Sequence, residues 1–345
     1  MKAAYISQHG SLDNILVGEV DDLRINPNEV LIETHFAALN HLDLFVIKGW
    51  QGLELKMPHV LGADGSGIVK EIGSEVSKLK IGDKVTINPG ISCGKCEMCL
   101  SGKQVLCKHF SIKGEHEWGT YAEFFKMPEI NVIKVPNSVN LDKAAAAPLT
   151  FLTAYRMLKT LAKVKPKDFV FIHGAGGGVS SAAVQIAKYL GAKVIATTSS
   201  SEKIERTKNL GADYVINYKE MKDYTQYVYK EITNKHGIDI VIDNVGSATF
   251  NTSIRLLRPN GRIITCGATS GSHVEFNLTN IFWKHIEIKG STMSNQGEFR
   301  EVMKLVFEDK LNPIIDKIYW LDRVKDAENY LNEGKQFGKV LLKVK

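Results

Sequence analysis

The sequence predicts an α/β protein of two domains, a small irregular β domain and a doubly wound parallel sheet. With 345 residues, the chain is long for one compact core. Up to about Phe125 it consists of short β-branched runs broken by glycine, and after Lys167 the pattern becomes strand, glycine turn and helix in repetition. After Gly290 this repetition ends.

Composition narrows the class of protein. Hydrophobic residues make up 44% and charged residues 24%, which is ordinary globular usage and excludes a disordered, collagen-like or coiled-coil chain. The net charge of +6 is spread along the chain, so it does not favour nucleic acid or anionic lipid. Because no apolar run has the length of a signal peptide or a membrane span, we expect a cytoplasmic protein with a small-molecule substrate and no membrane partner.

The two predicted domains rest on their successive strands. In the first, the runs are MKAAYI, VLIETHF, GIVKEIG, DKVTINPG and YAEFF. In the second, six runs separated by helical patterns complete a doubly wound sheet: FVFIH, KVIATT, YVINY, IDIVID, GRIITCG and HIEIKG. The last segment holds an amphipathic helix and a final strand KVLLKVK, with apolar positions at Phe299, Val302, Met303 and Val306.

A glycine turn, GAGGGVSS, joins the strand FVFIH to the helix that follows it. Such a turn lets backbone N–H groups approach a pyrophosphate, and the helix N-terminus adds a favourable partial charge. The match to GxGxxG is imperfect because Val179 stands in the sixth place of the motif when Gly174 is counted as the first. A glycine cluster alone can be merely structural, but the strand, helix and next strand around it predict dinucleotide binding.

The end of the second strand bears on which dinucleotide is bound. An NAD site normally carries an acid there for the ribose hydroxyls, whereas this chain has Ala196–Ser200 and no acid before Glu202. Hydroxyl residues leave room for a 2′-phosphate, and Lys203 can supply charge, although it could be one more surface lysine. We therefore predict NADPH, with NADH less favoured.

Four of the five cysteines lie in one window, Cys93-x2-Cys96-x2-Cys99-x7-Cys107. This spacing predicts one structural Zn²⁺ per chain, closed by four thiolates and therefore without an open position for substrate. Four free thiols are the plain alternative. A zinc module for nucleic acid would need a recognition helix or basic stripe, and Glu97, Met98 and Leu100 are neither.

Together these features resemble the medium-chain dehydrogenase/reductase superfamily of zinc alcohol dehydrogenases and quinone reductases, over essentially the whole chain. The resemblance implies a GroES-like β-rich catalytic domain at 1–149 with a zinc lobe at about 91–110, a Rossmann domain at 150–287, and a return to the catalytic domain at 288–345. It also implies a cleft between them and a homodimer or homotetramer. The motifs that carry it are AALNHLDLFVIKG, LGADGSGIVKEIG, KIGDKV, GTYAEF, AAAAPLTFLTAY and FGKVLLKV.

Departures from the zinc alcohol dehydrogenases point to the chemistry. At the places of their cysteine and histidine zinc ligands this chain has Asn40 and Ala63, and PLTFLTAY offers no third cysteine. Quinone and enoyl reductases are similar to this chain there, and their 2′-phosphate residues map to Lys203 and Tyr218. The predicted cofactor contacts are Ala175, Gly176, Gly177, Gly178, Val179, Ser180, Thr198, Ser199, Lys203, Tyr218, Asn244 and Gly267.

The resulting hypothesis is an NADPH-dependent reductase of a quinone, an activated alkene or a related carbonyl compound. Asn40, Thr150 and Tyr155 are the candidate catalytic polar groups. One alternative is an alcohol dehydrogenase with an atypical catalytic zinc, and another is a cofactor-sensing or nucleic-acid-binding protein without turnover. The candidate ligands of that second zinc are His41, His59, Asp64 and His116.

Overall fold

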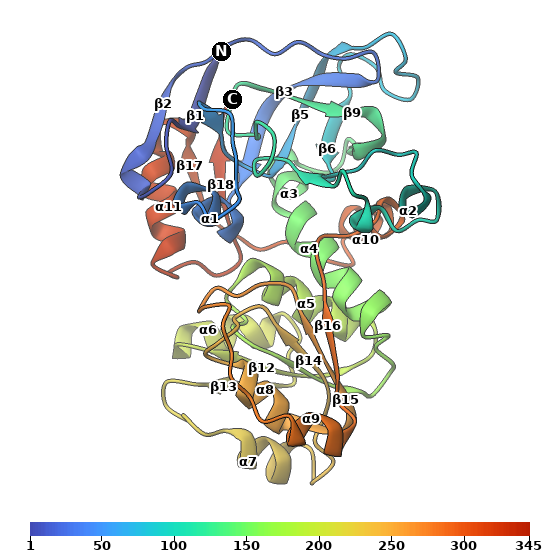
Figure 1. The fold of residues 1–345 in the computed structure, drawn as a ribbon, viewed down its shortest axis with the longest axis vertical. Helices are drawn as coiled ribbons and strands as arrows, with labels where there is room; N and C mark the ends of the chain where they lie inside the picture. Colours follow the sequence, from blue (N-terminus) through green and yellow to red (C-terminus); the bar gives the residue numbers. More distant parts are fainter. The chain divides into compact units, whose positions relative to one another are not determined.

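The structure is a computed structural model that describes all 345 residues. It divides into two compact units, the first comprising Met1–Leu152 and Ser294–Lys345, and the second Thr153–Met293 (Figure 1). The predicted boundary at 287/288 lies earlier than this division, because residues 287–290 form a strand of the second unit's sheet. No helix is long and apolar enough to cross a membrane.

The first unit is the β-rich domain. Its main sheet has seven strands in the order β10-β6-β5-β3-β18-β17, with β9 pairing to β3. A three-stranded sheet, β2-β1-β4, and the pair β7-β8 complete it. The strand bounds are β1 Lys2–Ile6, β2 Ile15–Glu19, β3 Glu29–Ala38, β4 His59–Val60, β5 Asp64–Ile72, β6 Lys84–Ile87, β7 Gly90–Ile91, β8 Ser111–Ile112, β9 Phe124–Pro128, β10 Val132–Lys134, β17 Ile315–Trp320 and β18 Lys339–Lys343.

The C-terminal segment belongs to this first unit because its last strand is hydrogen-bonded to an early one. β18 pairs antiparallel with β3, with Leu341 opposite Ala38, and both side chains are fully buried. The predicted amphipathic helix is α10, which buries the four apolar residues expected to face inward. The helices of the unit are α1 His41–Lys48, α2 Glu97–Leu100, α3 Leu141–Ala146, α10 Gln296–Phe307 and α11 Val324–Asn332. α4 Pro148–Tyr155 begins in this unit and ends in the second.

The second unit is the doubly wound domain that the sequence predicts. Its six strands are all parallel, in the order β13-β12-β11-β14-β15-β16, so the order reverses between β11 and β14. The strands are β11 Phe169–Ile172, β12 Lys193–Thr198, β13 Tyr214–Asn217, β14 Ile238–Asp243, β15 Leu257–Thr265 and β16 Glu287–Gly290. Its helices are α5 Gly178–Tyr189, α6 Ser201–Asn209, α7 Thr225–Tyr227, α8 Phe250–Leu256 and α9 Thr279–Lys284, and π-helical segments occupy Arg156–Leu161 and Val228–Ile232.

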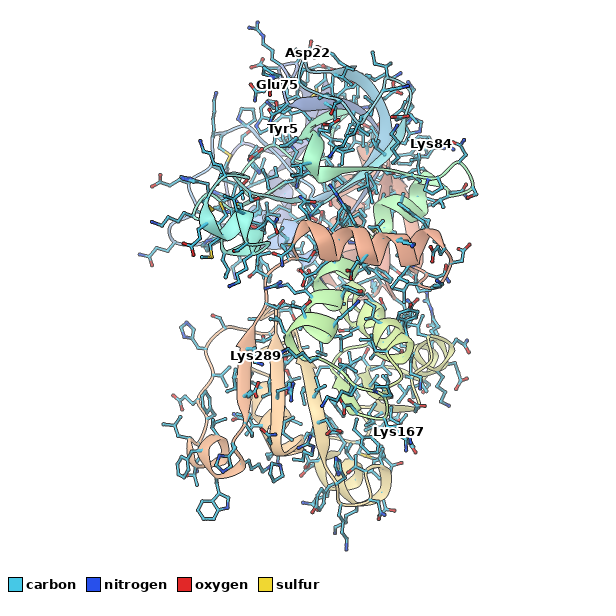
Figure 2. The ribbon with its side chains drawn as sticks, turned by 90° about the vertical axis from the view of Figure 1, so that its right-hand side faces the viewer. Tyr5, Asp22, Glu75, Lys84, Lys167 and Lys289 are labelled. Atoms are coloured by element: carbon cyan, nitrogen blue, oxygen red, sulfur yellow. The ribbon has the colours of Figure 1, made fainter.

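The apolar content of these strands explains why the sheet has helices on both faces. β14 is buried at all six positions, as expected for a central parallel strand covered on both sides. At one edge, β16 alternates partly buried and exposed residues, and Figure 2 labels Lys289 on this strand. Because all six strands run in one direction, the chain leaves every strand at the same edge of the sheet, where ligands of such folds bind.

Candidate functional site

The glycine turn lies between the end of β11 and the start of α5. Gly174 has a φ of +62°, which favours glycine, and its N–H donates to Thr197 Oγ1 at 3.1 Å. Gly177 is the N-cap of α5 and brings no side chain to cap the helix. The first N–H groups of α5 therefore have no side-chain acceptor from that residue, which is the arrangement that receives a phosphate.

The other predicted cofactor residues lie at the carboxyl ends of the neighbouring strands. Thr198 ends β12, Tyr218 follows β13, Asn244 follows β14 and Gly267 comes shortly after β15. The Tyr218 backbone N–H donates to Thr198 O at 3.1 Å, so these two residues are adjacent. Thr198 Oγ1 is buried without a hydrogen-bond partner, and because buried polar groups are normally paired, this atom is available to a ligand. The turn and this edge therefore fit a dinucleotide cofactor.

The predicted cofactor residues near the turn differ in what their side chains contact. Ser180 Oγ donates to His173 O at 2.7 Å, which ties α5 to the residue after β11, and Asn244 Nδ2 donates to Ser180 Oγ at 3.2 Å, which ties α5 to the residue after β14. Lys203 lies in the first turn of α6, whose N-cap Ser200 accepts from its backbone N–H. Tyr218 is 41% exposed. No acidic side chain ends β12, as the sequence indicates.

The four clustered cysteines come together in the lobe that contains α2. Their sulfur atoms lie within 4.8 Å of one another, and no disulfide joins them. Backbone N–H groups of Lys95 and Cys96 lower the pKa of Cys93 to about 6, so this thiol readily ionises. Four sulfur ligands at this spacing fit one tetrahedral Zn²⁺ with no vacant position.

Replacement of Cys99 by serine should remove this zinc, because three thiolates and a hydroxyl bind it far more weakly. We expect the zinc content of purified protein to fall well below one per chain and the melting temperature to fall by a few degrees. Elemental analysis and calorimetry measure the two effects. Cys266→Ser, outside the cluster, is the control and should retain its zinc. Retention of zinc by the Cys99 variant would show that the metal lies elsewhere.

A second polar cluster surrounds Asn40 in the first unit. Lys339 Nζ, on β18, donates to Leu39 O and Asn40 Oδ1, both at 2.6 Å, and to Asp64 Oδ2 at 3.2 Å. Asn40 Nδ2 donates to Asp64 Oδ2 at 3.0 Å, and Asp64 Oδ1 accepts from the Leu149 backbone N–H at 2.8 Å. All partners of Lys339 Nζ are acceptors, so the lysine is an ammonium even though burial lowers its pKa.

A pair of buried acids adjoins this cluster. Tyr121 OH lies 2.9 Å from Asp43 Oδ2 and 3.3 Å from Glu328 Oε1, and all three residues are buried. A hydroxyl has one proton to donate, so one carboxyl group must bring its own. Burial raises the pKa of Glu328 well above its usual range and that of Asp43 to about 6. Glu328 is therefore the acid that holds the proton.

Comparison with known proteins assigns a protein family to each of the two units. Residues 26–137 match the family described as alcohol dehydrogenase GroES-like domain, and residues 178–308 match zinc-binding dehydrogenase. An NAD-dependent alcohol dehydrogenase from Sulfolobus acidocaldarius is 32% identical, with all of both chains covered. The chain belongs to the zinc-type alcohol dehydrogenase family of medium-chain dehydrogenases/reductases. It is an oxidoreductase, and the family and the cysteine cluster support zinc and a nicotinamide cofactor.

Other members of this dehydrogenase family differ in the activities for which they are named. The acryloyl-coenzyme A reductase of Sulfurisphaera tokodaii is 31% identical over 94% of this chain and 95% of its own. A crystal structure of an NAD-dependent alcohol dehydrogenase is 40% identical, covers both chains completely and has a TM-score of 0.96. The cobalt- and zinc-bound alcohol dehydrogenase of Pyrobaculum aerophilum is 32% identical, covers 100% of this chain and 99% of its own, and has a TM-score of 0.89.

Within this dehydrogenase, the two remaining candidate catalytic groups lie on α4. Thr150 Oγ1 donates to Ala147 O at 3.3 Å, and Tyr155 OH accepts from Lys159 Nζ at 2.7 Å. Five residues apart, they project about 140° from each other around the helix. They therefore do not share one face of α4. Asn40, for its part, has both Nδ2 protons engaged, because it also donates to Ala38 O at 3.1 Å.

The candidate ligands of a second zinc are not gathered at metal-binding distance. His59 Nε2 contacts Gly114 O at 3.1 Å, and His116 Nδ1 accepts from the Ile112 N–H at 3.1 Å. Asp64 is hydrogen-bonded within the Lys339 cluster. Burial and the Lys339 ammonium lower the pKa of His41, which is half-buried at the start of α1.

Proposed function

We propose that this dehydrogenase is an NADP(H)-dependent reductase of conjugated acceptors, either quinones or activated alkenes. The observation that carries the proposal is the ion pair of Lys339 and Asp64 beside Asn40. It lies among the positions at which zinc alcohol dehydrogenases are expected to hold their catalytic metal. An ammonium already neutralises the carboxylate here, and an amide stands in place of a thiolate, so the donor set does not suit Zn²⁺.

The chemistry follows from that donor set. When bound, the nicotinamide cofactor supplies a hydride, which carries two electrons, to the electrophilic carbon of the acceptor, and a proton from water completes the product. Without a Lewis acid, an alkoxide from a simple alcohol loses several kcal/mol of stabilisation. A conjugated acceptor places the developing charge on a distant oxygen, so it needs less help. The acryloyl-coenzyme A reductase among the relatives supports an activated alkene.

An alcohol dehydrogenase with an atypical second zinc is the alternative, supported by relatives that are alcohol dehydrogenases. The deciding experiment combines metal content with a substrate panel. We expect about one zinc per chain, reduction of quinones, enones or enoyl thioesters, and slow oxidation of ethanol and 2-propanol. Two zinc ions per chain together with fast alcohol oxidation would establish the alternative. Cofactor binding without turnover of any acceptor would favour a sensing protein.

A preference for NADPH is part of the proposal, because β12 ends in hydroxyl residues with Lys203 and Tyr218 near its end. Lys203→Ala should weaken NADPH binding by about 1.5–3 kcal/mol, the value of a hydrogen bond to a charged group, and should leave NADH binding unchanged. Titration of both cofactors measures this difference. Lys208→Ala, later on the same helix, is the control. Equal affinity of the parent protein for both cofactors would contradict the preference.

We also propose a homo-oligomer that forms through the edge of the second unit's sheet. α9, β16 and the segment before them expose apolar side chains, and a twofold axis at Ile288 would place Glu287 opposite Lys289 of the partner subunit. The exposed apolar residues are Phe276, Leu278, Phe282, Trp283 and Ile288. Ile288→Lys should therefore give a smaller particle by light scattering.

We also propose a cytoplasmic location, because the thiols of the zinc lobe must remain reduced.

A further inference from the structure

Asp243 is the last residue of β14, and its side chain is fully buried. Its Oδ1 accepts from the backbone N–H of Val245 at 3.0 Å and of Gly246 at 3.1 Å. Thr249 Oγ1 lies 2.9 Å from both carboxyl oxygens, and Ser253 Oγ donates to Oδ2 at 2.7 Å. Backbone N–H groups can only donate, so this set of partners suits an ionised carboxylate.

No cation neutralises this carboxylate. The titratable group at ion-pair distance is His173, whose Nε2 lies 4.0 Å from Asp243 Oδ2. Burial lowers the pKa of His173 to about 4, so its imidazole is neutral at physiological pH. Ser253 Oγ gives its proton to Asp243 and accepts from His173 Nε2 at 2.9 Å, and Nδ1 has no partner. A full negative charge therefore remains in the interior of the second unit.

The charge of Asp243 raises the pKa of two neighbouring groups. Cys266 directly follows β15, the strand next to β14. Burial and the negative charge of Asp243 raise the pKa of Cys266 to about 12, and the same two causes raise the pKa of Tyr224 to about 12. The charge of Asp243 thus acts on Cys266, just after β15, and on Tyr224, whose ring stacks on Phe171 of β11 with the centroids 5.7 Å apart. A buried charge is screened little by salt, so its effect extends farther than that of a surface group.

The strand order indicates which part of the cofactor this charge would affect. In a doubly wound sheet the pyrophosphate lies at the turn after the first strand, here β11, and the adenosine half lies toward the second strand, here β12. The other half then lies beyond the point where the order reverses, over β14 and β15. That half carries the nicotinamide ring, which is positively charged when oxidised and neutral when reduced.

We propose that the Asp243 carboxylate favours the oxidised cofactor over the reduced one by its charge, and so determines the ratio of their affinities. This inference rests on the proposed nicotinamide function. Stabilising a positive ring also favours loss of hydride, because positive charge develops on the ring as hydride departs. Asp243 therefore acts on the cofactor through its electrostatic field and does not contact the substrate. Burying a charge without a counter-ion destabilises the fold, and the effect on cofactor binding would explain why the charge is present.

Binding of NADP⁺ and NADPH to the purified, zinc-loaded protein tests the inference. Asp243→Asn keeps the size of the side chain and removes the charge. We expect the affinity for NADP⁺ to fall about threefold or more relative to that for NADPH. Ser253→Ala is the matched control, since it removes one donor and keeps the charge, and it should leave the ratio unchanged. An unchanged ratio in a folded Asp243→Asn protein would overturn the inference.

The unmodified protein gives a second measurement that does not depend on the folding of a variant. It should bind NADP⁺ at least as tightly as NADPH, and a strong preference for NADPH would contradict the inference. The same titrations are made with NAD⁺ and NADH. If neither pair binds, the proposed function itself fails, whereas binding of both forms with an unfavourable ratio contradicts only the role of Asp243.

Discussion

Lys339→Met is expected to destabilise the first unit by about 3–5 kcal/mol, the usual cost of removing one partner of a buried ion pair. The lysine is 3% exposed and Asp64 is completely buried. Without the ammonium, Asp64 keeps only the Asn40 and Leu149 donors, and Leu39 O and Asn40 Oδ1 lose their partner. Chemical denaturation followed by circular dichroism measures the free energy of unfolding.

Two further variants decide whether the charge or the packing is responsible. Lys335→Met removes an exposed lysine of the same C-terminal segment and should change stability by less than about 0.5 kcal/mol. Asp64→Asn combined with Lys339→Met removes both charges and should recover a substantial part of the loss. If the double variant is no more stable than Lys339→Met alone, the ion pair is not the cause.

The sequence predicts the backbone architecture well, because that architecture depends on local patterns. Six strands of the parallel sheet, the glycine turn, and the inward face of α10 follow from hydrophobic periodicity and glycine placement. The cysteine cluster was equally predictable, since its members are close in the chain and have the spacing of a metal site.

The polar interior could not be predicted in the same way. Lys339 lies about 300 residues from Asn40, and its position in an apolar strand motif gives no sign of its partner. Glu328 resembles any acid of an amphipathic helix, and only the fold brings it to Tyr121. The sequence places Asp243 at the end of a strand, but it does not reveal the four groups that donate hydrogen bonds to its carboxylate. Such contacts depend on tertiary packing, which residue spacing does not encode.

Lys113 is another residue that the sequence did not single out. It directly follows β8, is 2% exposed, and has no hydrogen bond or ion pair at its Nζ. Burial lowers its pKa to about 8, which the more distant charges of Glu117 and Glu29 only partly oppose. Because protonation is harder in the folded than in the unfolded chain, the folded state is penalised wherever the amine must carry a proton.

Lys113→Met should therefore raise the free energy of unfolding by about 3 kcal/mol at pH 7, since each pKa unit between about 8 and 10.5 is worth about 1.4 kcal/mol. The penalty is full below the folded pKa and vanishes above the unfolded one, so the gain should shrink steadily between pH 8 and pH 10.5. Denaturation curves of both proteins at pH 7, 9 and 10.5 measure this trend. Lys78→Met, at an exposed position, should show neither the gain nor its pH dependence. A gain that is constant across this range would come from added apolar packing, and the lysine would then be charged in the folded protein at no cost.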